Sequence, residues 1–238
     1  TEIYTLSLHD ALPISLGMAE QGLLIQQKVI GGYMYLRSLI GPENLLYAFF
    51  DNPELIHDCM QSWLRLADVV TGRHQQYFHI EEIFFAKDIC YNKGPFISPD
   101  MMNEFLFPYY QQLVNNVKAR NKTTKNIYIQ VDTDGFCDPV ISLYKKAIGM
   151  NMMSPFEVAS GCDVVRTGRD YPELIISGGI DKRVLSQSIE AIDQYLGNIL
   201  PLMRNRGGYI PTCDHGVPPE VPWQNYLHYR KRCVEYGS

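Results

Sequence analysis

From Gly22 onward, short apolar runs typical of buried strands alternate with longer segments that have the periodicity of amphipathic helices. This alternation predicts a parallel sheet joined by right-handed crossovers, and therefore an α/β fold. In the last four units the polar or glycine residues follow the strand, which is where α/β enzymes hold their catalytic groups. The expected strands are residues 23–30, 83–86, 127–131, 151–154, 174–177 and the short run Tyr209–Ile210.

The helices between these strands have recognisable starts. Asn52 and Pro53 provide a capping residue and a first-turn proline ahead of a long apolar face, and Ser98 caps a helix expected to run to about Arg120. The other expected helices are residues 33–40 and 42–50, one ending near 147, one from Glu157 to about 167, and the last two at 188–203 and 222–236.

A closed barrel and a doubly wound sheet both satisfy this pattern. A dinucleotide-binding sheet would carry GxGxxG after its first strand, and the sequence contains only the isolated pairs Gly31-Gly32 and Gly178-Gly179. A complete (β/α)8 barrel has eight units in about 250 residues. We therefore predict an incomplete TIM-type (β/α)8 barrel with about its last six β/α units.

Composition narrows the function. The chain has 238 residues, is 46% hydrophobic and carries a formal charge of -5, so it has no general attraction to nucleic acid. No apolar run approaches the roughly 18 residues of a membrane-spanning helix. The six cysteines form no CxxC pair, which favours reduced thiols. We expect a cytoplasmic protein with no nucleic-acid or membrane partner.

The first 15 residues, TEIYTLSLHDALPIS, fit no strand–helix unit. The string LSLHDALPI resembles translated sequencing-adapter DNA, so we exclude residues 1–15 from the fold as a segment that does not look native. Residues 16–238 are then expected to form one barrel domain. An ordinary N-terminal helix is the alternative for this segment.

The stretch from Gly207 to Pro222, GGYIPTCDHGVPPEVP, ends the last expected strand and places Cys213, Asp214 and His215 side by side. Its glycines and prolines prevent a helix, so these reactive groups are expected in a loop at the carboxyl end of a strand. A buried cysteine and a hydrogen-bonded loop histidine are the simpler interpretation. The sequence leaves both open.

Carboxylates follow two earlier strands. Asp132 and Asp134 are two residues apart and would point the same way in an extended strand, and Glu157 follows the next strand. Carboxylate, thiolate and imidazole groups together can bind a divalent metal, and a carboxylate-rich set suits manganese or iron as well as zinc. The alternatives are turn formation or helix capping by Asp134, and a favourable helix dipole at Glu157.

Several strings, taken in order, resemble the uroporphyrinogen decarboxylase superfamily, which includes methylcobamide:coenzyme M methyltransferases. The resemblance covers about Leu23 to Tyr236 and implies a TIM-type barrel without its first two strands. The strings are GGYMYLRSLIGPENLL, DNPELIHDCM, GPFISPDMMNEFLFPYYQQL, DTDG, SPFEVASGCDV, SGGIDKRVL and CDHGVPPEVPWQNY.

The resemblance implies roles where the strings match. In the methyltransferase branch, a His-x-Cys-Gly after the fifth strand and a Cys after the eighth bind zinc, so the matching Asp132, Asp134 and Cys213 are the expected metal ligands. This sequence departs from that pattern, because Asp-x-Asp replaces His-x-Cys. In the decarboxylase branch a His-Gly contacts the substrate, and His215-Gly216 matches it.

Three functions follow from these observations. The first is a metal-dependent, corrinoid-linked methyltransferase with zinc as the first choice of metal, a corrinoid as co-substrate and a corrinoid protein as partner. The second is metal-free uroporphyrinogen decarboxylation in porphyrin biosynthesis, and the third is a non-catalytic binding barrel. The expected catalytic residues are His215 and Asp132, and the expected substrate-binding residues are Arg37, Asp88, Tyr91, Glu157 and Asp181.

Overall fold

The structure is a computed structural model that describes residues 17–18, 20–121 and 126–237. The segment 1–15 that we separated from the fold lies outside the described residues. The chain divides into two compact units. Unit 1 comprises residues 1–86 and 97–130, and unit 2 comprises residues 87–96 and 131–238.

Six strands form one sheet in the order β1-β2-β5-β6-β7-β8. The expected α/β fold, with six strands each followed by helical segments, is confirmed. The strand order follows the chain order without the reversal of a doubly wound sheet, as in a barrel.

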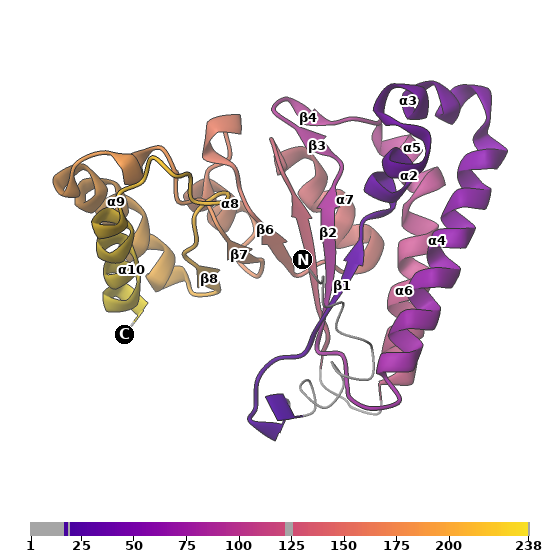
Figure 1. Ribbon diagram of the computed structural model, residues 1–238, viewed down its shortest axis with the longest axis horizontal. Helices are drawn as coiled ribbons and strands as arrows, with labels where there is room; N and C mark the ends of the chain where they lie inside the picture. The colour runs from indigo at the N-terminus through magenta and orange to yellow at the C-terminus, as the bar shows by residue number, and fades with distance from the viewer. Residues whose placement is uncertain (1–16, 19, 122–125, 238) are drawn as a thin grey trace, which may run out of the picture. The chain divides into compact units, whose positions relative to one another are not determined.

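Unit 1 contains β1 (Gln26–Ile30) and β2 (Glu82–Asp88), which pair in parallel with Gln26 opposite Glu82 and Ile30 opposite Ala86. In this unit α4 and α6 lie side by side (Figure 1). Its helices are α2 (Gly32–Ile40), α3 (Pro42–Asp51), α4 (Pro53–His74), α5 (Pro99–Phe105) and α6 (Phe107–Arg120).

The single helix expected from Ser98 to about Arg120 was wrong in one respect, because the structure has two helices there. The Ser98 hydroxyl accepts a hydrogen bond from the backbone N–H of Met101 at 3.2 Å, as expected of a cap. Leu106 separates α5 from α6, and Pro108 lies in the first turn of α6. Proline has no N–H to donate to the preceding turn, so the helix is interrupted and begins again.

An aromatic group fixes the core of unit 1. The ring of Tyr110 lies 5.0 Å from Trp63 and 4.9 Å from Phe85, measured between centroids. The Trp63 indole N–H donates to the carbonyl of Ile30 at 2.8 Å, which joins α4 to the end of β1. Gly32 packs closely against this group, because a Cβ there would lie 2.9 Å from the Tyr110 Cε1 atom and 2.6 Å from the Met60 Cε atom at the end of a flexible side chain.

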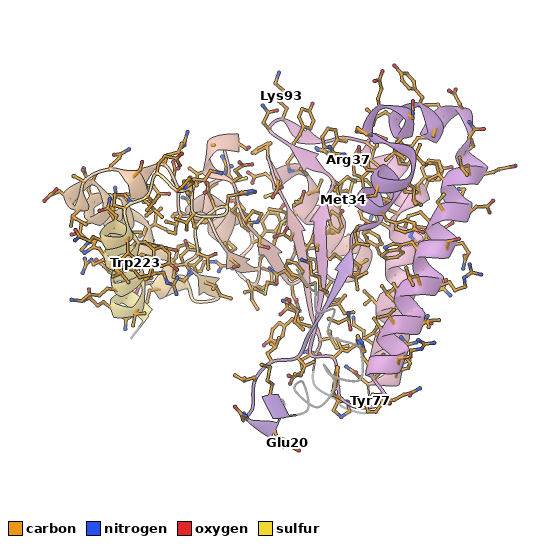
Figure 2. The ribbon with its side chains drawn as sticks, viewed as in Figure 1. Glu20, Met34, Arg37, Tyr77, Lys93 and Trp223 are labelled. Carbon is orange, nitrogen blue, oxygen red and sulfur yellow. The ribbon has the colours of Figure 1, made fainter. Side chains whose placement is uncertain are left out.

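Unit 2 contains a short antiparallel hairpin, β3 (Cys90–Tyr91) with β4 (Gly94–Pro95), and Figure 2 shows Lys93 at its tip. This hairpin was not predicted from the sequence, because strands of two residues are too short to show a period. The other strands are β5 (Tyr128–Thr133), which begins in unit 1, β6 (Met152–Ser154), β7 (Ile175–Ser177) and β8 (Tyr209–Ile210). Strand β7 pairs in parallel with both β6 and β8.

The helical segments of unit 2 are α7 (Asp138–Ile148), η1 (Val158–Ser160), α8 (Val164–Asp170), η2 (Val184–Ser186), α9 (Ile189–Arg206) and α10 (Trp223–Gly237). The continuous helix expected from Glu157 to about Thr167 was wrong. Gly161 has φ of 94°, which ends the short 3-10 helix η1. Asp163 then caps α8 by accepting from the backbone N–H groups of Val165 and Arg166.

The core of unit 2 is an apolar cluster between the two long helices α9 and α10, which lie side by side in Figure 1. Leu196 of α9 and Tyr229 of α10 are almost fully buried in it. Among the helices in the described part of the chain, none is both long enough and apolar enough to cross a bilayer.

Candidate functional site

Polar side chains follow the carboxyl ends of four neighbouring strands of unit 2. Asp132 is the second-last residue of β5, and Asp134 lies just beyond the strand. Glu157 follows β6, Asp181 follows β7, and His215 follows β8. Parallel strands bring their carboxyl ends to one edge of a sheet. These residues are therefore candidates for one site.

Asp134 and His215 form a pair that joins the β5 and β8 loops. The Asp134 Oδ1 atom lies 3.7 Å from the His215 Nδ1 atom, and each side chain is 41% exposed. This distance suits an ion pair when the imidazole is protonated. The sequence alternative in which Asp134 caps the next helix is not observed, since the N-cap of α7 is Cys137.

Asp132 is held separately from Asp134. Its Oδ2 atom accepts a hydrogen bond of 2.8 Å from the Ser154 hydroxyl at the end of β6. Between them, the buried Thr133 hydroxyl accepts from the backbone N–H of Cys90 at 3.0 Å. The two aspartates thus have different partners, with Asp132 near β6 and Asp134 near the β8 loop.

Glu157 connects three loops. Its Oε2 atom accepts from the backbone N–H of Gly135 at 3.0 Å and from the Ser160 hydroxyl at 3.2 Å. Its Oε1 atom lies 3.7 Å from the Lys182 Nζ atom, after β7. Glu157 is the N-cap residue of η1, but its side chain makes no capping hydrogen bond to the backbone of that turn.

Asp214 is the fully buried carboxylate of the Cys-Asp-His run. Its Oδ2 atom accepts from the backbone N–H of Val158 at 2.9 Å, and its Oδ1 atom accepts from the backbone N–H of Lys182 at 3.2 Å. Burial raises the pKa of Asp214, and these two N–H donors only partly oppose it. Asp214 thus fastens the β8 loop to the β6 and β7 loops.

Asp181 is engaged with its neighbour Arg183. The carboxylate is 8% exposed and accepts hydrogen bonds from the Arg183 guanidinium at 2.7 to 3.1 Å. Burial raises the pKa of Asp181, but the Arg183 hydrogen bonds and charge outweigh it and hold the pKa below its usual range. Its predicted contact with substrate stays a prediction.

Tyr91 and Gly135 approach each other through their backbones. The Tyr91 carbonyl accepts from the backbone N–H of Phe136 at 2.8 Å, and the Tyr91 ring stacks on Phe96 with centroids 4.8 Å apart. Gly135 has φ of 76°, and a Cβ there would lie 2.4 Å from the Tyr91 carbonyl oxygen. Only glycine fits the last position of the DTDG string.

The structure does not place the other two predicted substrate-binding residues, Arg37 and Asp88, with the residues described above. Arg37 belongs to unit 1, where it lies on α2 near Met34 (Figure 2), with its Nη1 atom 3.8 Å from the Met34 sulfur. Asp88 ends β2, and its side chain lies outside the described part of the structure. Both stay predictions.

Cys213 is half-buried and packs against the apolar cluster of α9 and α10. Its backbone forms an isolated parallel bridge with Ile180, which extends the β7–β8 pairing. Burial raises the pKa of its thiol, and the Asp214 carboxylate raises it further. These surroundings agree with the simpler interpretation of Cys213 as a packed thiol.

The predicted metal ligands do not converge. Among the described residues, no three of Asp132, Asp134, Glu157, Cys213 and His215 bring their ligand atoms within 4.8 Å of one another. Metal bonds of about 2 Å require closer convergence. As they stand, these side chains do not fit a metal ion, and we derive no reaction step through one.

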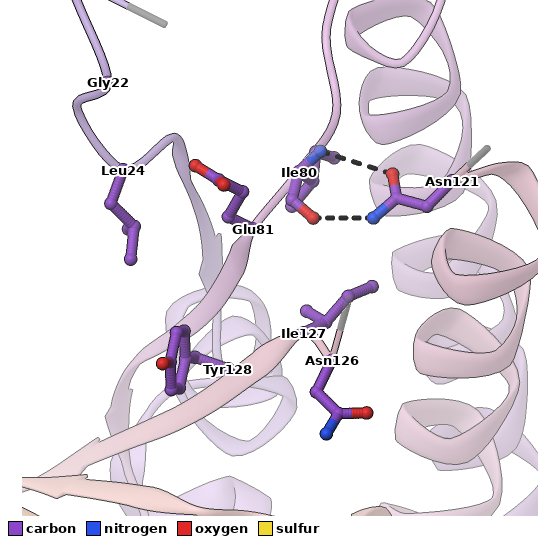
Figure 3. Close-up of a pocket in the computed structure, with 8 residues that line it drawn as sticks. All are labelled: Gly22, Leu24, Ile80, Glu81, Asn121, Asn126, Ile127 and Tyr128. Atoms are coloured by element: carbon purple, nitrogen blue, oxygen red, sulfur yellow. Dashed lines mark hydrogen bonds between the residues drawn. The ribbon is translucent and has the colours of Figure 1, made fainter. Parts of the chain in front are cut away.

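A cavity of about 440 Å³ lies in unit 1, beside the amino-terminal ends of β2 and β5 (Figure 3). Asn121 closes one wall by donating to the carbonyl of Ile80 at 2.7 Å and accepting from its N–H at 3.3 Å. None of the predicted site residues lines this cavity. The cavity therefore does not belong to the carboxyl-end site.

Ser154, Lys182 and the structural role of Asp214 were not predicted from the sequence. Ser154 and Lys182 follow the rule that polar residues end the strands, and that rule would have found them. Asp214 had no separate signal, because adjacent residues in an irregular loop give no period from which burial could be inferred.

Comparisons with known proteins agree on the family. A model described as Uroporphyrinogen decarboxylase (URO-D) matches residues 29–236. Uroporphyrinogen decarboxylase from Geobacter metallireducens is 26% identical over 178 residues, which cover 73% of this chain and 49% of that protein. The enzyme of the same name from Sulfurimonas denitrificans is 23% identical over 187 residues, covering 77% of this chain and 49% of that protein.

The fold is also similar to that of a solved methyltransferase from Methanosarcina mazei, with a TM-score of 0.68, 15% identity, and coverage of 97% of this chain and 65% of that one. The chain spans about half the length of the curated relatives that it matches. The URO-D model covers most of the chain, including every strand-end loop described above, and the chain therefore belongs to the uroporphyrinogen decarboxylase family.

Proposed function

We propose that this chain contains the residues that transfer protons in a decarboxylase. The substrate would be a carboxylated pyrrole, with uroporphyrinogen as the first compound to test. The exposed Asp134–His215 pair at the carboxyl ends of the strands carries this proposal, because its atoms lie 3.7 Å apart and both side chains face solvent. The curated relatives support it by name, since they are uroporphyrinogen decarboxylases.

The chemistry requires a group that stabilises positive charge. A proton adds to a pyrrole carbon, and the ring becomes a cation. The bond to the acetate carboxyl group then breaks, its electron pair neutralises the ring, and CO2 leaves. A second proton completes the methyl group while the first returns to solvent, so that one proton is consumed for each CO2 released.

In this scheme Asp134 and Asp132 stabilise the pyrrole cation and accept hydrogen bonds from pyrrole N–H groups. His215 supplies or removes a proton at the ring, with its Nδ1 atom facing Asp134. Glu157 and Asp214 hold the loops in place through backbone N–H groups. Because the carboxylates face the pyrrole, the negatively charged acetates would be bound by cations such as Lys182.

Methyl transfer from a corrinoid to a thiol is the second candidate. The loop that presents Cys213 beside His215 favours it, and so does the methyltransferase whose fold is similar. This function would require Cys213 and the two aspartates to come together as ligands of one metal ion, and in the described structure their ligand atoms do not lie close enough together. Burial of the Cys213 thiol, which raises its pKa, ranks this candidate second.

The test uses the protein encoded by the complete gene, supplied with uroporphyrinogen under anaerobic conditions. Products are oxidised and separated by chromatography according to their number of carboxyl groups. We expect porphyrins with fewer carboxyl groups, and a loss of rate of about 10²- to 10⁴-fold in Asp134→Asn and His215→Gln.

A matched control is available in the same unit. His228 lies 2.8 Å from Asp193 in a second histidine–carboxylate pair on the α9 and α10 helices, so His228→Gln should retain the wild-type rate. If His228→Gln lost as much rate as His215→Gln, the loss in His215→Gln would be attributed to general destabilisation of the protein and not to a role in the reaction. A wild-type protein that leaves uroporphyrinogen unchanged but demethylates a methylcorrinoid in the presence of a thiol would establish the second candidate instead.

A further inference from the structure

Two buried cysteines and an aspartate lie close together in unit 2, and none of them belongs to the Asp134–His215 pair. Cys137 lies immediately before α7, Asp138 is the first residue of that helix, and Cys162 lies between η1 and α8. One ligand atom from each of the three lies within 4.8 Å of the others, and no other such group of three occurs in the described part of the chain.

The two sulfurs are already spaced as metal ligands would be. The Cys137 and Cys162 Sγ atoms lie 3.6 Å apart, and both residues are almost fully buried. Two zinc–sulfur bonds of about 2.3 Å at a tetrahedral angle place the sulfurs about 3.8 Å apart. The two thiols lie within hydrogen-bond distance of each other, far beyond the roughly 2.05 Å of a disulfide, and a metal ion could replace the shared proton with little movement of the sulfurs.

The carboxylate of Asp138 has one oxygen available. Its Oδ2 atom is paired with the Arg166 guanidinium. Its Oδ1 atom is buried and has no hydrogen-bond partner among the described residues. A buried carboxylate oxygen without a partner is costly, and a cation bound there would supply the missing interaction.

Charge balance agrees with a divalent cation. A divalent ion with two thiolates and one carboxylate carries a single negative charge, and the Arg166 guanidinium beside Asp138 neutralises it. The carbonyl of Gly135, which accepts from the Cys162 thiol at 3.3 Å, is a further oxygen beside the cluster.

We propose that Cys137, Cys162 and Asp138 bind one zinc ion, which fastens the start of α7 to the loop before α8. Two thiolates select zinc over magnesium and calcium, which prefer oxygen ligands. On binding, each thiol releases its proton to solvent, and no oxidant or reductant is involved. The site uses none of the residues Asp132, Asp134 and Cys213, and it does not depend on the proposed decarboxylase function.

The experiment begins with the chain expressed without a histidine tag, stripped of metal under reducing conditions and then titrated with Zn²⁺. We expect about one equivalent to remain after dialysis, as measured by mass spectrometry, and the thermal midpoint to rise by several degrees. Titration with Co²⁺ in place of Zn²⁺ should give the intense absorption of thiolate-to-cobalt charge transfer. This readout needs no substituted protein.

Substitutions then locate the ligands. Cys137→Ser and Cys162→Ser should abolish the charge-transfer band or weaken it strongly, and Asp138→Asn should weaken zinc binding at least tenfold. Cys59→Ser, which removes a thiol on α4 in unit 1, is the matched control and should bind zinc as the wild type does. Cys213→Ser should also retain the metal.

Three results would overturn the proposal. The first is wild-type protein that retains no zinc and gives no cobalt band. The second is loss of zinc in Cys213→Ser together with retention in Cys162→Ser, which would place the metal on the ligand set expected from the sequence. The third is a titration of the unfolded, unreduced protein that finds two fewer thiols than the six in the sequence, which would identify the pair as a disulfide.

Discussion

The Oδ2 atom of Asp214, a fully buried carboxylate, accepts a hydrogen bond of 2.9 Å from the backbone N–H of Val158. The same carboxylate accepts from the backbone N–H of Lys182. One side chain of the β8 loop therefore satisfies main-chain donors of the β6 and β7 loops, and the site depends on it for its shape.

Asp214→Ala should lower the free energy of unfolding by about 2 to 4 kcal/mol, because two N–H donors lose their acceptor inside the protein. Urea denaturation measures this loss. Asp170→Ala, which removes an exposed carboxylate at the end of α8, should change the stability by less than about 0.5 kcal/mol. Equal effects of the two substitutions would show that Asp214 does not hold the loops.

Gly135→Ala should destabilise unit 2 by about 2 to 4 kcal/mol, because the new methyl group would meet the Tyr91 backbone and the positive φ would be strained. Gly197→Ala is the matched control. Gly197 lies inside α9, and a Cβ there meets nothing within 4 Å, so alanine should stabilise the helix by about 0.5 to 1 kcal/mol. Thermal unfolding should therefore show shifts of opposite sign, and a neutral Gly135→Ala would contradict the close approach.

Arg120→Ala should weaken the packing of α6 against α4 in unit 1. The guanidinium reaches Asp68 at 2.7 Å, the Gln75 side chain at 2.7 Å and the Thr71 hydroxyl at 3.0 Å. Arg120 is partly exposed, so solvent screens part of the interaction and we expect a loss of about 1 to 2 kcal/mol in urea denaturation. Arg65→Ala on the exposed face of α4 should be nearly neutral. A loss in Arg65→Ala as large as in Arg120→Ala would argue against the network.

The buried thiol of Cys233 predicts a loss of stability in alkali. Burial raises the pKa of Cys233 to about 11, from 9.0 when exposed. A raised folded-state pKa contributes stability that is present below pH 9 and is lost as the pH rises toward 11, by an amount on the order of 2 kcal/mol. Urea denaturation between about pH 8 and pH 10.5 should show a shallower decline for Cys233→Ala than for wild type. Val234→Ala should follow the wild-type slope, and parallel slopes for all three proteins would refute the assignment.

Much of the fold could be predicted because its signals are local. The start of α4 at Pro53 was predicted from its first-turn proline, although the Asn52 side chain makes no capping hydrogen bond, and strands β2 and β5 follow from apolar runs. Strand β1 was expected at residues 23–30 but begins only at Gln26, so the apolar residues 23–25 precede it. The break at Leu106 was missed although Pro108 signals it, because proline is also tolerated in the first turn of a helix. The hairpin of Tyr91 depends on contacts with Phe136, which no local pattern contains.

The candidate site was predictable only in outline. That Asp132 and Asp134 end one strand and His215 follows another strand of the same sheet can be read from the sequence, and the 3.7 Å approach of Asp134 to His215 agrees with it. Their partners cannot be read, because each hydrogen bond depends on the path of an irregular loop. Cys137 and Cys162 show the same limit, since they lie 25 positions apart and only the loop geometry brings their sulfurs together.

Glu157 and Asp214 hold the loops through the main-chain N–H groups of Gly135, Val158 and Lys182. A bond that ends on a main-chain amide places no demand on the side chain at that position beyond excluding proline. A substitution at position 158 or 182 would therefore keep the hydrogen bond from the main chain to Asp214, although one at position 182 would lose the ion pair with Glu157. Within one family, such an arrangement lets evolution replace the groups that recognise the substrate while the scaffold that positions them is inherited intact.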